Sequence, residues 1–245
     1  MDDNIVSLKF DGKTSSDFGC HLQYPTQIVH AKREITPTSV PGVSGDYLSD
    51  NYRYSNITQP LTFFVIRPAQ YETWEQLQFA FLDWLTPSFK NKYSKFYLDL
   101  INPYHWLAYL SEAPTWTISG IDTATVTLTL NCKPYLVYQD EKFEPVPSSV
   151  ISNEKLPAFP LWRIVGDGDF TLSINEMEYK LNNIDGEVFI DTTRFLVYKS
   201  LNEFRGMNAI FPNHEFPVLN PGTNSIKLVG NYSKFEFKPN WRRLA

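Results

Sequence analysis

Acidic side chains gather at two places in the second half of the chain, where they could carry acid–base chemistry. Asp167 and Asp169 form one group, and Asp185, Glu187 and Asp191 form the other. Paired carboxylates are what a glycoside hydrolase needs, and the same oxygens could hold Ca²⁺. Several of these residues adjoin glycines, however, and aspartate is favoured in hairpin turns because it hydrogen-bonds the local backbone. The sequence therefore predicts turns here, with a glycoside hydrolase site and a calcium site as alternatives.

No other set of residues has the spacing of a catalytic or metal site. The chain has four histidines, at His21, His30, His105 and His214. None lies at the short spacing that places two imidazoles on one metal ion. Cys20 and Cys132 lie far apart without a neighbouring base, and the sequence contains neither a GxSxG elbow nor a GxxxxGK phosphate loop. We expect no catalytic residue, no metal and no cofactor, so the chain is predicted not to be an enzyme.

Aromatic side chains on a β-sandwich could stack on sugar rings, and the second half of the chain offers five candidates. These are Trp162, Tyr179, Tyr198, Tyr232 and Trp241. Most of them alternate with polar neighbours inside predicted strands, so a place in the core is the first interpretation for each. Sugar binding remains an alternative.

The overall charge argues against a protein that grips nucleic acid. The 22 lysines and arginines are outnumbered by 27 aspartates and glutamates, which gives a formal net charge of −5. Electrostatic binding of a phosphate backbone needs the opposite balance. A weakly acidic protein could still form a wall past which DNA slides without sticking, although most acidic proteins have no contact with DNA.

The sequence carries no signal for export or membrane insertion. The start, MDDNIVSLKFDG, has neither the basic nor the apolar region of a signal peptide. No stretch approaches the roughly 18 apolar residues that a membrane-spanning helix needs. We expect synthesis in a cytoplasm, no membrane contact, and two buried thiols in a reducing compartment.

Most of the chain has the period-two alternation of β-strands. Within residues 123–132, for example, Val126, Leu128 and Leu130 alternate with threonines, which predicts a strand with one buried face. The same rhythm recurs in both halves of the chain, separated by glycine- and asparagine-rich turns. The sequence therefore predicts a mainly β fold.

One segment breaks the β pattern. Residues 71–85 repeat apolar side chains at helical spacing and form the one convincing helix. Thr73 and Gln76 could form a capping box at its start. The pair Thr86-Pro87 is expected to end it, because a helical residue before proline clashes with the proline ring.

The composition divides the chain into two domains. Prolines become frequent between residues 133 and 160, where few residues are periodic. We predict an N-terminal domain over residues 1–135, a linker over 136–160, and a C-terminal domain over 161–245. The short, regularly spaced strands of the last part are typical of a β-sandwich.

Five stretches of the sequence, in order along the chain, carry a family resemblance. They are FDGKTSSDFGCHL at 10–22, AKREITPTSVPGVSGDYLSDNYRYSNIT at 31–58, the helix at 71–85, NCKPYLVY at 131–138 and FPVLNPGTNSIKLVGNYSKFEFKPNWRRL at 216–244. Together they resemble the distal tail proteins, called Dit, of siphophages that infect Gram-positive bacteria. Many members carry a basic residue after the Pro-Gly of the second stretch, whereas Val43 stands here.

The resemblance implies the rest of the architecture. It implies an N-terminal tail-tube-like β-sandwich with one α-helix and a long β-hairpin, and a C-terminal galectin-like β-sandwich. Members form homo-hexameric rings, with the N-terminal domains around a lumen through which DNA passes without specific binding. The expected partners are the major tail tube protein, the tail-associated tip protein and receptor-binding proteins. The expected location is the phage tail tip in the virion, after assembly in the bacterial host cytoplasm, and the copy number is six or, back to back, twelve.

The segment at 31–58 is also unusual in its physical chemistry. If it protrudes as a hairpin, its many apolar side chains cannot be covered by its own subunit, and such surfaces mark interaction sites. The predicted ring-interface residues are Val40, Pro41, Gly42, Val43, Gly45, Asp46 and Tyr47. The predicted structural turn near the end of the chain consists of Asn220, Pro221, Gly222 and Asn224. The alternative function is that of a carbohydrate-binding module that contacts host cell-wall polysaccharide.

Overall fold

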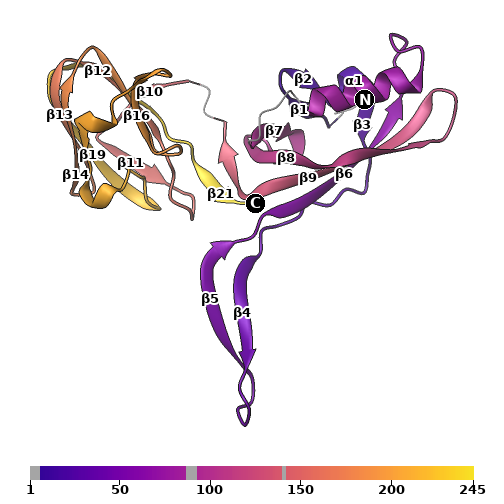
Figure 1. The fold of residues 1–245 in the computed structure, drawn as a ribbon, viewed down its shortest axis with the longest axis horizontal. Coiled ribbons are helices and arrows are strands. Elements are labelled where there is room, and N and C mark those ends of the chain that lie inside the picture. The colour runs from indigo at the N-terminus through magenta and orange to yellow at the C-terminus, as the bar shows by residue number, and fades with distance from the viewer. Residues whose placement is uncertain (1–5, 87–92, 140–141) are drawn as a thin grey trace. The chain divides into compact units, whose positions relative to one another are not determined.

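A computed structural model gives the structure of residues 6–86, 93–139 and 142–245. The chain forms two compact units, which are drawn in Figure 1. The N-terminal unit comprises Met1–Leu136 and Leu244–Ala245, and the C-terminal unit comprises Val137–Arg243. Antiparallel strands dominate both units, and the described ranges contain a single α-helix, so the predicted fold class is confirmed.

One large sheet forms the body of the N-terminal unit. The elements of this unit are β1 Leu8–Phe10, β2 Lys13–Thr14, β3 Cys20–Leu22, β4 Arg33–Ser39, β5 Asp46–Tyr54, β6 Ile57–Ile66, α1 Trp74–Leu85, β7 Ser94–Leu98, β8 Tyr104–Ile118 and β9 Thr123–Tyr138. The sheet has the order β2-β1-β7-β8-β9-β6-β3, and β21 (Arg242–Leu244) pairs with β9. The strands β4 and β5 pair with each other as a separate two-stranded sheet.

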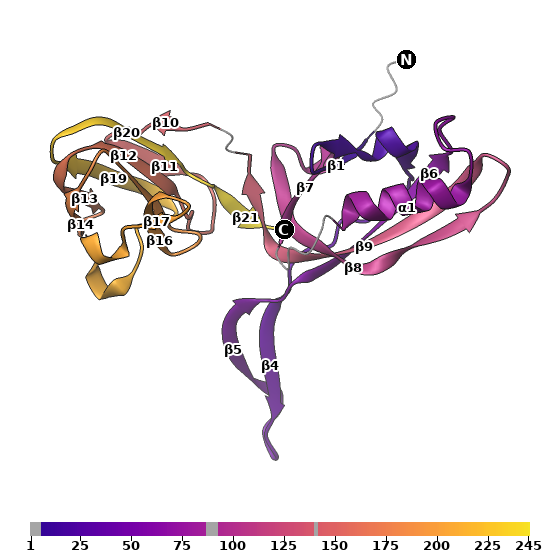
Figure 2. The same cartoon turned by 45° about the horizontal axis from the view of Figure 1, so that its top comes forward.

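The alternation predicted for residues 123–132 is confirmed in β9. Val126, Leu128 and Leu130 are completely buried, and the threonines between them lie on the other face. Leu128 lies directly opposite Leu61 of β6, so the two strands present one continuous apolar face. The helix α1 covers that face, as Figure 2 shows.

Aromatic rings join the helix to the sheet. Trp84 of α1 stacks on Phe18 with ring centroids 4.9 Å apart, and Phe81 meets the edge of Phe18 at 5.5 Å. The Trp84 indole N–H donates to the Phe10 carbonyl at 2.7 Å, which satisfies a polar group inside the core. Aromatic pairs of this kind stabilise beyond the area that they bury.

The helix begins and ends close to the predicted positions. Thr73 is the N-cap, and its hydroxyl accepts a hydrogen bond from the Gln76 backbone N–H at 3.2 Å. The Gln76 side chain does not return to Thr73 but accepts from the Glu72 N–H at 2.9 Å, so the capping box is shifted by one residue. The α-helix ends at Leu85, with Thr86 as its C-cap, and Pro87 lies outside the described residues.

Gly19 lies where only glycine fits, just after the turn that delivers Phe18 to the core. Its φ is +67°, and a Cβ built there would lie 2.0 Å from the Ile66 carbonyl oxygen. The Gly19 carbonyl in turn accepts from the Ile66 N–H at 3.0 Å. The Phe-Gly pair therefore allows β3 to approach β6 closely.

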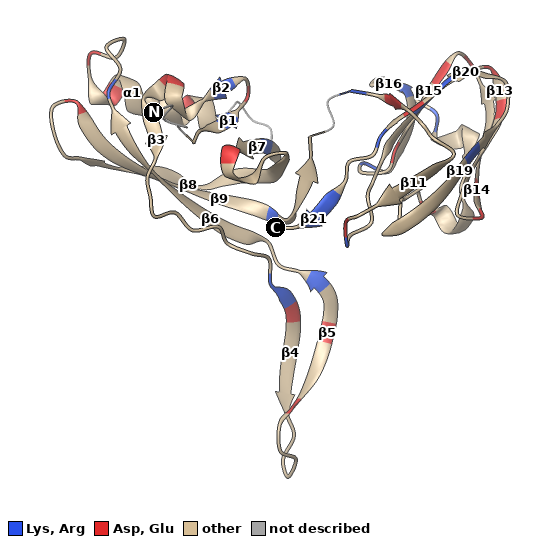
Figure 3. Ribbon diagram, turned by 180° about the vertical axis from the view of Figure 1, so that it is seen from behind, with Lys and Arg blue, Asp and Glu red and all other residues tan. Residues whose placement is uncertain are grey.

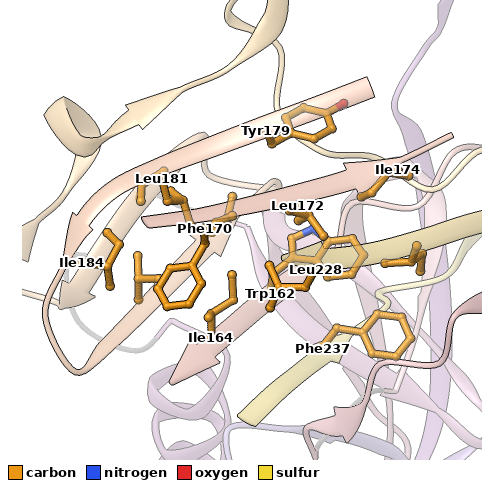
Figure 4. Packing of buried hydrophobic residues seen from close by; sticks show 14 of the residues in the cluster. Trp162, Ile164, Phe170, Leu172, Ile174, Tyr179, Leu181, Ile184, Leu228 and Phe237 are labelled. Atoms are coloured by element: carbon orange, nitrogen blue, oxygen red, sulfur yellow. The ribbon is translucent and has the colours of Figure 1, made fainter. Parts of the chain in front are cut away.

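The C-terminal unit is a sandwich of two sheets. The first has the order β10 (Glu144–Pro145), β20 (Tyr232–Lys238), β12 (Leu161–Gly166), β15 (Glu187–Asp191), β16 (Leu196–Ser200) and β17 (Glu203–Phe204). The second has the order β11 (Ser149–Ser152), β19 (Gly222–Val229), β13 (Gly168–Ile174), β14 (Met177–Ile184) and β18 (Ala209–Ile210). Buried side chains of both sheets form one core, in which Trp162 stacks on Phe237 at 5.5 Å and packs near Leu172 (Figure 4).

The stretch 136–160, predicted as a linker, contains two short strands. β10 pairs with β20 and β11 pairs with β19, each at the edge of its sheet. An edge position tolerates Pro145 because the missing N–H can face away from the sheet. The proline-rich composition that suggested a linker is thus also compatible with edge strands.

The chain returns to the N-terminal unit after the C-terminal unit is complete. The Ala245 N–H donates to the Pro134 carbonyl at 3.1 Å, and the Ala245 carbonyl accepts from the Ala31 N–H at 2.9 Å. Ala245 is buried, with 6% of its surface exposed. Three residues were too few for the sequence pattern to reveal β21.

His105 is a buried titratable residue of the N-terminal unit, and its protonation should change the stability of the fold. It lies in β8 with 1% of its surface exposed, and neither ring nitrogen has a hydrogen-bond partner in the described structure. Burial, together with the charge of Lys95, lowers the pKa of His105 to about 4. The unfolded chain takes up a proton near pH 6.5, whereas the folded chain resists protonation until about pH 4.

We therefore expect stability to fall as the pH drops from 6.5 toward 4 and the loss to level off below that. Each pKa unit corresponds to about 1.4 kcal/mol, so the loss at pH 4 is on the order of 3 kcal/mol. Urea titrations of the wild type and of His105→Phe at several pH values measure this loss. The variant should lose less stability than the wild type over this range, and an equal loss in both proteins would contradict the assignment.

Candidate functional site

The hairpin of β4 and β5 extends from the sheet of the N-terminal unit (Figures 1 and 2). Its strands pair over most of their length, with Pro37 opposite Leu48 and Thr38 opposite Tyr47. The tip is a tight turn in which the Val43 N–H donates to the Val40 carbonyl at 3.1 Å. Gly42 has a φ of +83° and follows Pro41, an arrangement that suits a type II turn.

The hairpin exposes apolar side chains on both of its faces. Tyr47 is 71% exposed and Leu48 is 62% exposed, and consecutive residues of a strand point to opposite faces. Tyr52 is 88% exposed, at an irregularity of β5 where its φ is +54°. A two-stranded ribbon has no core of its own and is marginally stable alone, so a surface of this kind is expected to be covered by a partner.

Ion pairs hold the root of the hairpin. Arg33 pairs with Asp50, and Arg53 pairs with Glu34 at 2.8 Å. A hydrogen bond from the Ser55 hydroxyl, together with Arg53, lowers the pKa of Glu34, and the Tyr52 backbone N–H, together with Arg33, lowers the pKa of Asp50. Both pairs join β4 to β5, so they hold the two strands of the ribbon together at its root.

The segment that leads into the hairpin is anchored by the buried Gln59 of β6. The Gln59 side chain accepts from the Val29 N–H at 2.9 Å and donates to the Gln27 carbonyl at 2.6 Å. Across the root, the Ser55 N–H donates to the Lys32 carbonyl at 3.0 Å. These bonds tie an irregular stretch to the rigid sheet just before the ribbon begins.

The predicted interface residues lie together at the far end of the hairpin. All seven are exposed: Val40, Pro41, Gly42, Val43, Gly45, Asp46 and Tyr47. The sequence analysis did not single out the four charged residues of the root, although one residue of each sign at either end of the segment was a usable signal. The partner that covers the tip is treated under the proposed function.

The predicted turn near the end of the chain is organised by Asn224, which is fully buried. Its side-chain amide donates to the carbonyls of Asn220 at 2.8 Å and Gly222 at 3.1 Å. Its side-chain oxygen accepts from the Asn220 N–H at 2.8 Å and from the Asn175 side chain at 2.8 Å. One side chain thus satisfies both ends of the Asn-Pro-Gly turn and joins it to the neighbouring turn at Asn175.

The acidic residues serve turns, as predicted. Asp167 accepts from the Gly186 N–H and Asp169 from the Asn183 N–H, each at 2.8 Å. Asp185 pairs with Lys199 at 3.1 Å. The described residues contain no group of three or more histidine, cysteine, aspartate or glutamate side chains that could hold a metal ion.

The last two carboxylates of that set also have structural partners, but Glu187 lies in a strand and not in a turn as predicted. Glu187 accepts from Arg163, which also pairs with Glu236 at 2.9 Å. Asp191 accepts from the Arg194 N–H at 3.0 Å, and burial raises the pKa of Asp191. All five carboxylates therefore have a structural partner, which leaves the hydrolase hypothesis without support from their geometry.

The structure disperses the aromatic residues that were candidates for sugar stacking. Trp162 and Tyr179 are buried in the core, and Trp241 packs against it. Tyr198 stacks on Phe189 at 5.3 Å, and the Arg163 guanidinium lies 6.0 Å from the same Phe189 ring. Tyr232, at 44% exposure, is the most accessible of the five, and they do not form a common platform.

The histidines are also dispersed. His105 of β8 is buried and His21 of β3 is partly buried, with β9 and β6 between their strands, whereas His30 and His214 are exposed. His214 borders an open apolar hollow of about 300 Å³ that sequence analysis did not reveal, lined chiefly by Phe195, Phe204, Phe211 and Phe216. Within the described ranges, no helix is both long and apolar enough to cross a membrane.

Comparisons with known proteins give a likeness of fold. No protein-family model matches the chain, and no curated protein sequence matches it. Among solved structures, the chain is similar to the crystal structure of Dit of phage SPP1, described as a paradigm of the hub adsorption apparatus in phages that infect Gram-positive bacteria. The TM-score is 0.65 at 14% sequence identity, over 96% of this chain and 97% of that chain. The two chains therefore share a Dit-like two-domain β fold over nearly their whole lengths.

The turn at Asn224 generates a stability prediction. Asn224→Ala should lower the free energy of unfolding of the C-terminal unit by about 2–4 kcal/mol, because several buried polar groups lose their partner at once. The exposed neighbour Thr223 provides the matched control, and Thr223→Ala should change stability by no more than about 0.5 kcal/mol. Urea denaturation measures the free energy of unfolding of both variants. Equal losses in the two variants would show that the Asn224 side chain does not stabilise the turn.

Proposed function

We propose that this chain is a structural protein of a phage tail whose copies join through the β4–β5 hairpin into a homo-hexameric ring. The ring connects the major tail tube protein on one face with the tail-associated tip protein on the other, and DNA passes through its lumen. The observation that carries the proposal is the hairpin with exposed apolar side chains on both faces. The likeness to SPP1 Dit supports the choice of a tail hub among proteins that assemble.

A neighbouring copy is the natural cover for the hairpin. A contact between an arm on one copy and a different surface on the next is heterologous, and it closes into a ring when the rotation divides a full turn evenly. Burying one large apolar side chain is worth about 1.5–3 kcal/mol. Tyr47, Leu48 and Tyr52 together would therefore contribute several kcal/mol to each contact and offset part of the cost of association.

The remaining features of the proposal follow from the ring. The N-terminal units surround the lumen and the C-terminal units lie outside, where receptor-binding proteins can attach. Six copies form one ring, and two rings back to back would give twelve. The protein is assembled in the bacterial host cytoplasm and becomes part of the virion at the tail tip, and its role is to position other proteins.

Removal of the hairpin tip tests the proposal directly. A variant in which residues 40–47 are replaced by Gly-Gly should keep its fold, because these residues contribute no side chain to the core. The wild type should have six or twelve times the 28.4 kDa mass of one chain by light scattering, whereas the variant should be a monomer. Circular dichroism checks that the variant is folded. An unchanged oligomer mass in the variant would refute the proposal.

A single substitution provides a finer test with a matched control. Leu48→Asp places a charge on the apolar face of the hairpin, and we expect it to shift the assembly toward monomers by at least tenfold in concentration. Leu201 is also an exposed leucine, at 73% against 62% for Leu48, but it belongs to the C-terminal unit. Leu201→Asp should therefore leave assembly unchanged in sedimentation experiments, and equal effects of the two variants would argue against a specific hairpin contact.

A further inference from the structure

The open apolar hollow of the C-terminal unit has a lining that comes from both sheets of the sandwich. Its volume is about 300 Å³. We call it the phenylalanine hollow, after the rings of Phe195, Phe204, Phe211 and Phe216 that line it. Charged residues of both signs are spread over the strands of this unit (Figure 3), whereas the described residues of the lining include no aspartate, glutamate, lysine or arginine.

Edge-to-face contacts between aromatic rings form the walls of the hollow. The ring of Phe216 meets that of Phe211 at 5.0 Å and that of Phe195 at 5.6 Å, between centroids. Tyr179 of β14 supports Phe211 from the core at 5.5 Å. Phe211 and Phe216 also pack against the buried side chains of the sandwich. The walls are thus anchored to the core, and the hollow is a preformed feature of the fold.

A tight turn between Phe211 and Phe216 brings these two rings together. Asn213 and His214 in this turn have φ values of +53° and +59°, a left-handed conformation that asparagine and histidine adopt more readily than most residues. The His214 N–H donates to the Phe211 carbonyl at 3.2 Å. The turn therefore places the His214 side chain, the polar one of the described lining, beside the hollow.

The hollow lies where both sheets of the sandwich end. β17 is the last strand of the six-stranded sheet, and β18 is the last strand of the five-stranded sheet. The chain passes from β17 to β18 through the single turn Gly206–Asn208, and the Asn208 side chain donates to the Asn182 carbonyl of β14 at 2.8 Å. On their outer sides, neither β17 nor β18 pairs with another described strand. Free edges of this kind can accept an additional strand.

Phe204 of β17 combines backbone groups at the free edge with a side chain in the hollow. It lies opposite Tyr198 of β16, and the next N–H along the strand, that of Arg205, donates to the Val197 carbonyl at 2.7 Å. In an antiparallel ladder, Tyr198 and Phe204 are then a pair without mutual hydrogen bonds, so the Phe204 N–H and carbonyl point away from β16. A strand that paired with Phe204 would therefore pass beside the hollow.

The exposed apolar area favours a single segment over a second folded copy of the chain. Four exposed large apolar residues lie in the lining or next to it in the sequence, namely Phe195, Phe204, Met207 and Ile210. Since an aromatic side chain buries about 150–250 Å² in full, these four expose on the order of 500 Å². A standard interface buries about 800 Å² on each partner. The patch is therefore small for a stable contact between two copies.

The lining also restricts the chemistry of the ligand. A sugar or a charged group must find hydrogen-bond partners when it leaves water, and His214 is the polar side chain that the described lining offers. Pockets for small molecules range from about 300 to 1,000 Å³. This hollow lies at the lower limit of that range, which suits one large apolar side chain.

We propose that the phenylalanine hollow binds an extended polypeptide segment of another protein, which pairs with the free edge of β17 and places one large apolar side chain in the hollow. In this mode of recognition, main-chain hydrogen bonds give affinity and the pocket for the side chain gives specificity. The site uses neither the hairpin nor the ring, so the inference goes beyond the proposed function.

Selection from a library of random heptapeptides on the immobilised full-length protein tests the site. Enriched peptides should share one large apolar residue at a fixed position. Gly206→Trp places an indole at the hollow, and the variant should fold because a Cβ built at Gly206 meets no atom within 4 Å. Phe204→Ser removes one wall at an exposed position. Ile151→Trp, at an exposed residue of β11 in the same unit, is the matched control.

Fluorescence anisotropy with labelled peptides measures the affinities. We expect Gly206→Trp and Phe204→Ser each to weaken the binding of the enriched peptides at least tenfold, because the apolar side chain loses its pocket. Ile151→Trp should bind them as the wild type does. A selection that enriches no peptide, or equal binding by all three variants, would overturn the site.

Methylation of single backbone nitrogens in the enriched peptides tests the strand pairing. The N–H groups of a strand point alternately to its two sides, so methylation at every second position should weaken binding at least tenfold, with little effect at the positions between. Equal binding by all methylated peptides would show that the side chain enters the hollow without strand pairing, and it would overturn the assignment of an extended segment.

The oligomer mass separates a segment of another protein from a second copy of this chain. Gly206→Trp should have the same mass as the wild type by light scattering, because the hollow is not used between copies. Loss of the oligomer in Gly206→Trp would show that a second copy occupies the hollow and would overturn this inference. A wild type that is itself monomeric would refute the proposed ring and leave the peptide results unchanged, so the two failures are distinguishable.

Discussion

A ribbon of two strands has no interior, and this constraint governs the N-terminal unit. Neighbouring residues such as Tyr47 and Leu48 point to opposite sides, so no folding back of the ribbon onto one surface could cover both. The unit compensates at the root, where Arg33 and Glu34, which are consecutive and therefore on opposite faces, each form an ion pair with β5. Gln59 and the sheet behind it hold the incoming segment. The body of the unit thus holds a two-stranded ribbon that would be marginally stable by itself.

Structural features that depend on one segment could be predicted from the sequence, whereas features that depend on the pairing of strands could not. The alternation in β9 and the helical spacing of Leu77, Phe81 and Leu85 are local, and the structure bears both out. The turn at Asn224 was also visible because glycine and asparagine mark turns locally. By contrast, Arg163, Phe189 and Tyr198 become neighbours only through the register of three strands, so the sequence offered Tyr198 as an isolated aromatic residue.

Two buried polar side chains differ in whether they have hydrogen-bond partners. Asn224 has several well-placed partners and joins two turns, so its burial specifies one backbone arrangement. His105 is buried against Tyr97, with ring centroids 5.0 Å apart, and its ring nitrogens are without partners in the described structure. A satisfied polar group adds specificity, whereas an unsatisfied one makes stability depend on its protonation state. His105 therefore makes the stability of the N-terminal unit depend on pH. The Asn224 side chain does not titrate, so its burial has no such effect on the C-terminal unit.

The position of β21 in the chain has a consequence for biosynthesis. Ala245, whose carbonyl holds the Ala31 N–H ahead of the hairpin, follows the entire C-terminal unit in the sequence. A ribosome therefore releases the hairpin long before it releases the residue that anchors the hairpin's entry. The N-terminal unit therefore cannot complete its backbone hydrogen bonds until the segment that follows the C-terminal unit has been synthesised.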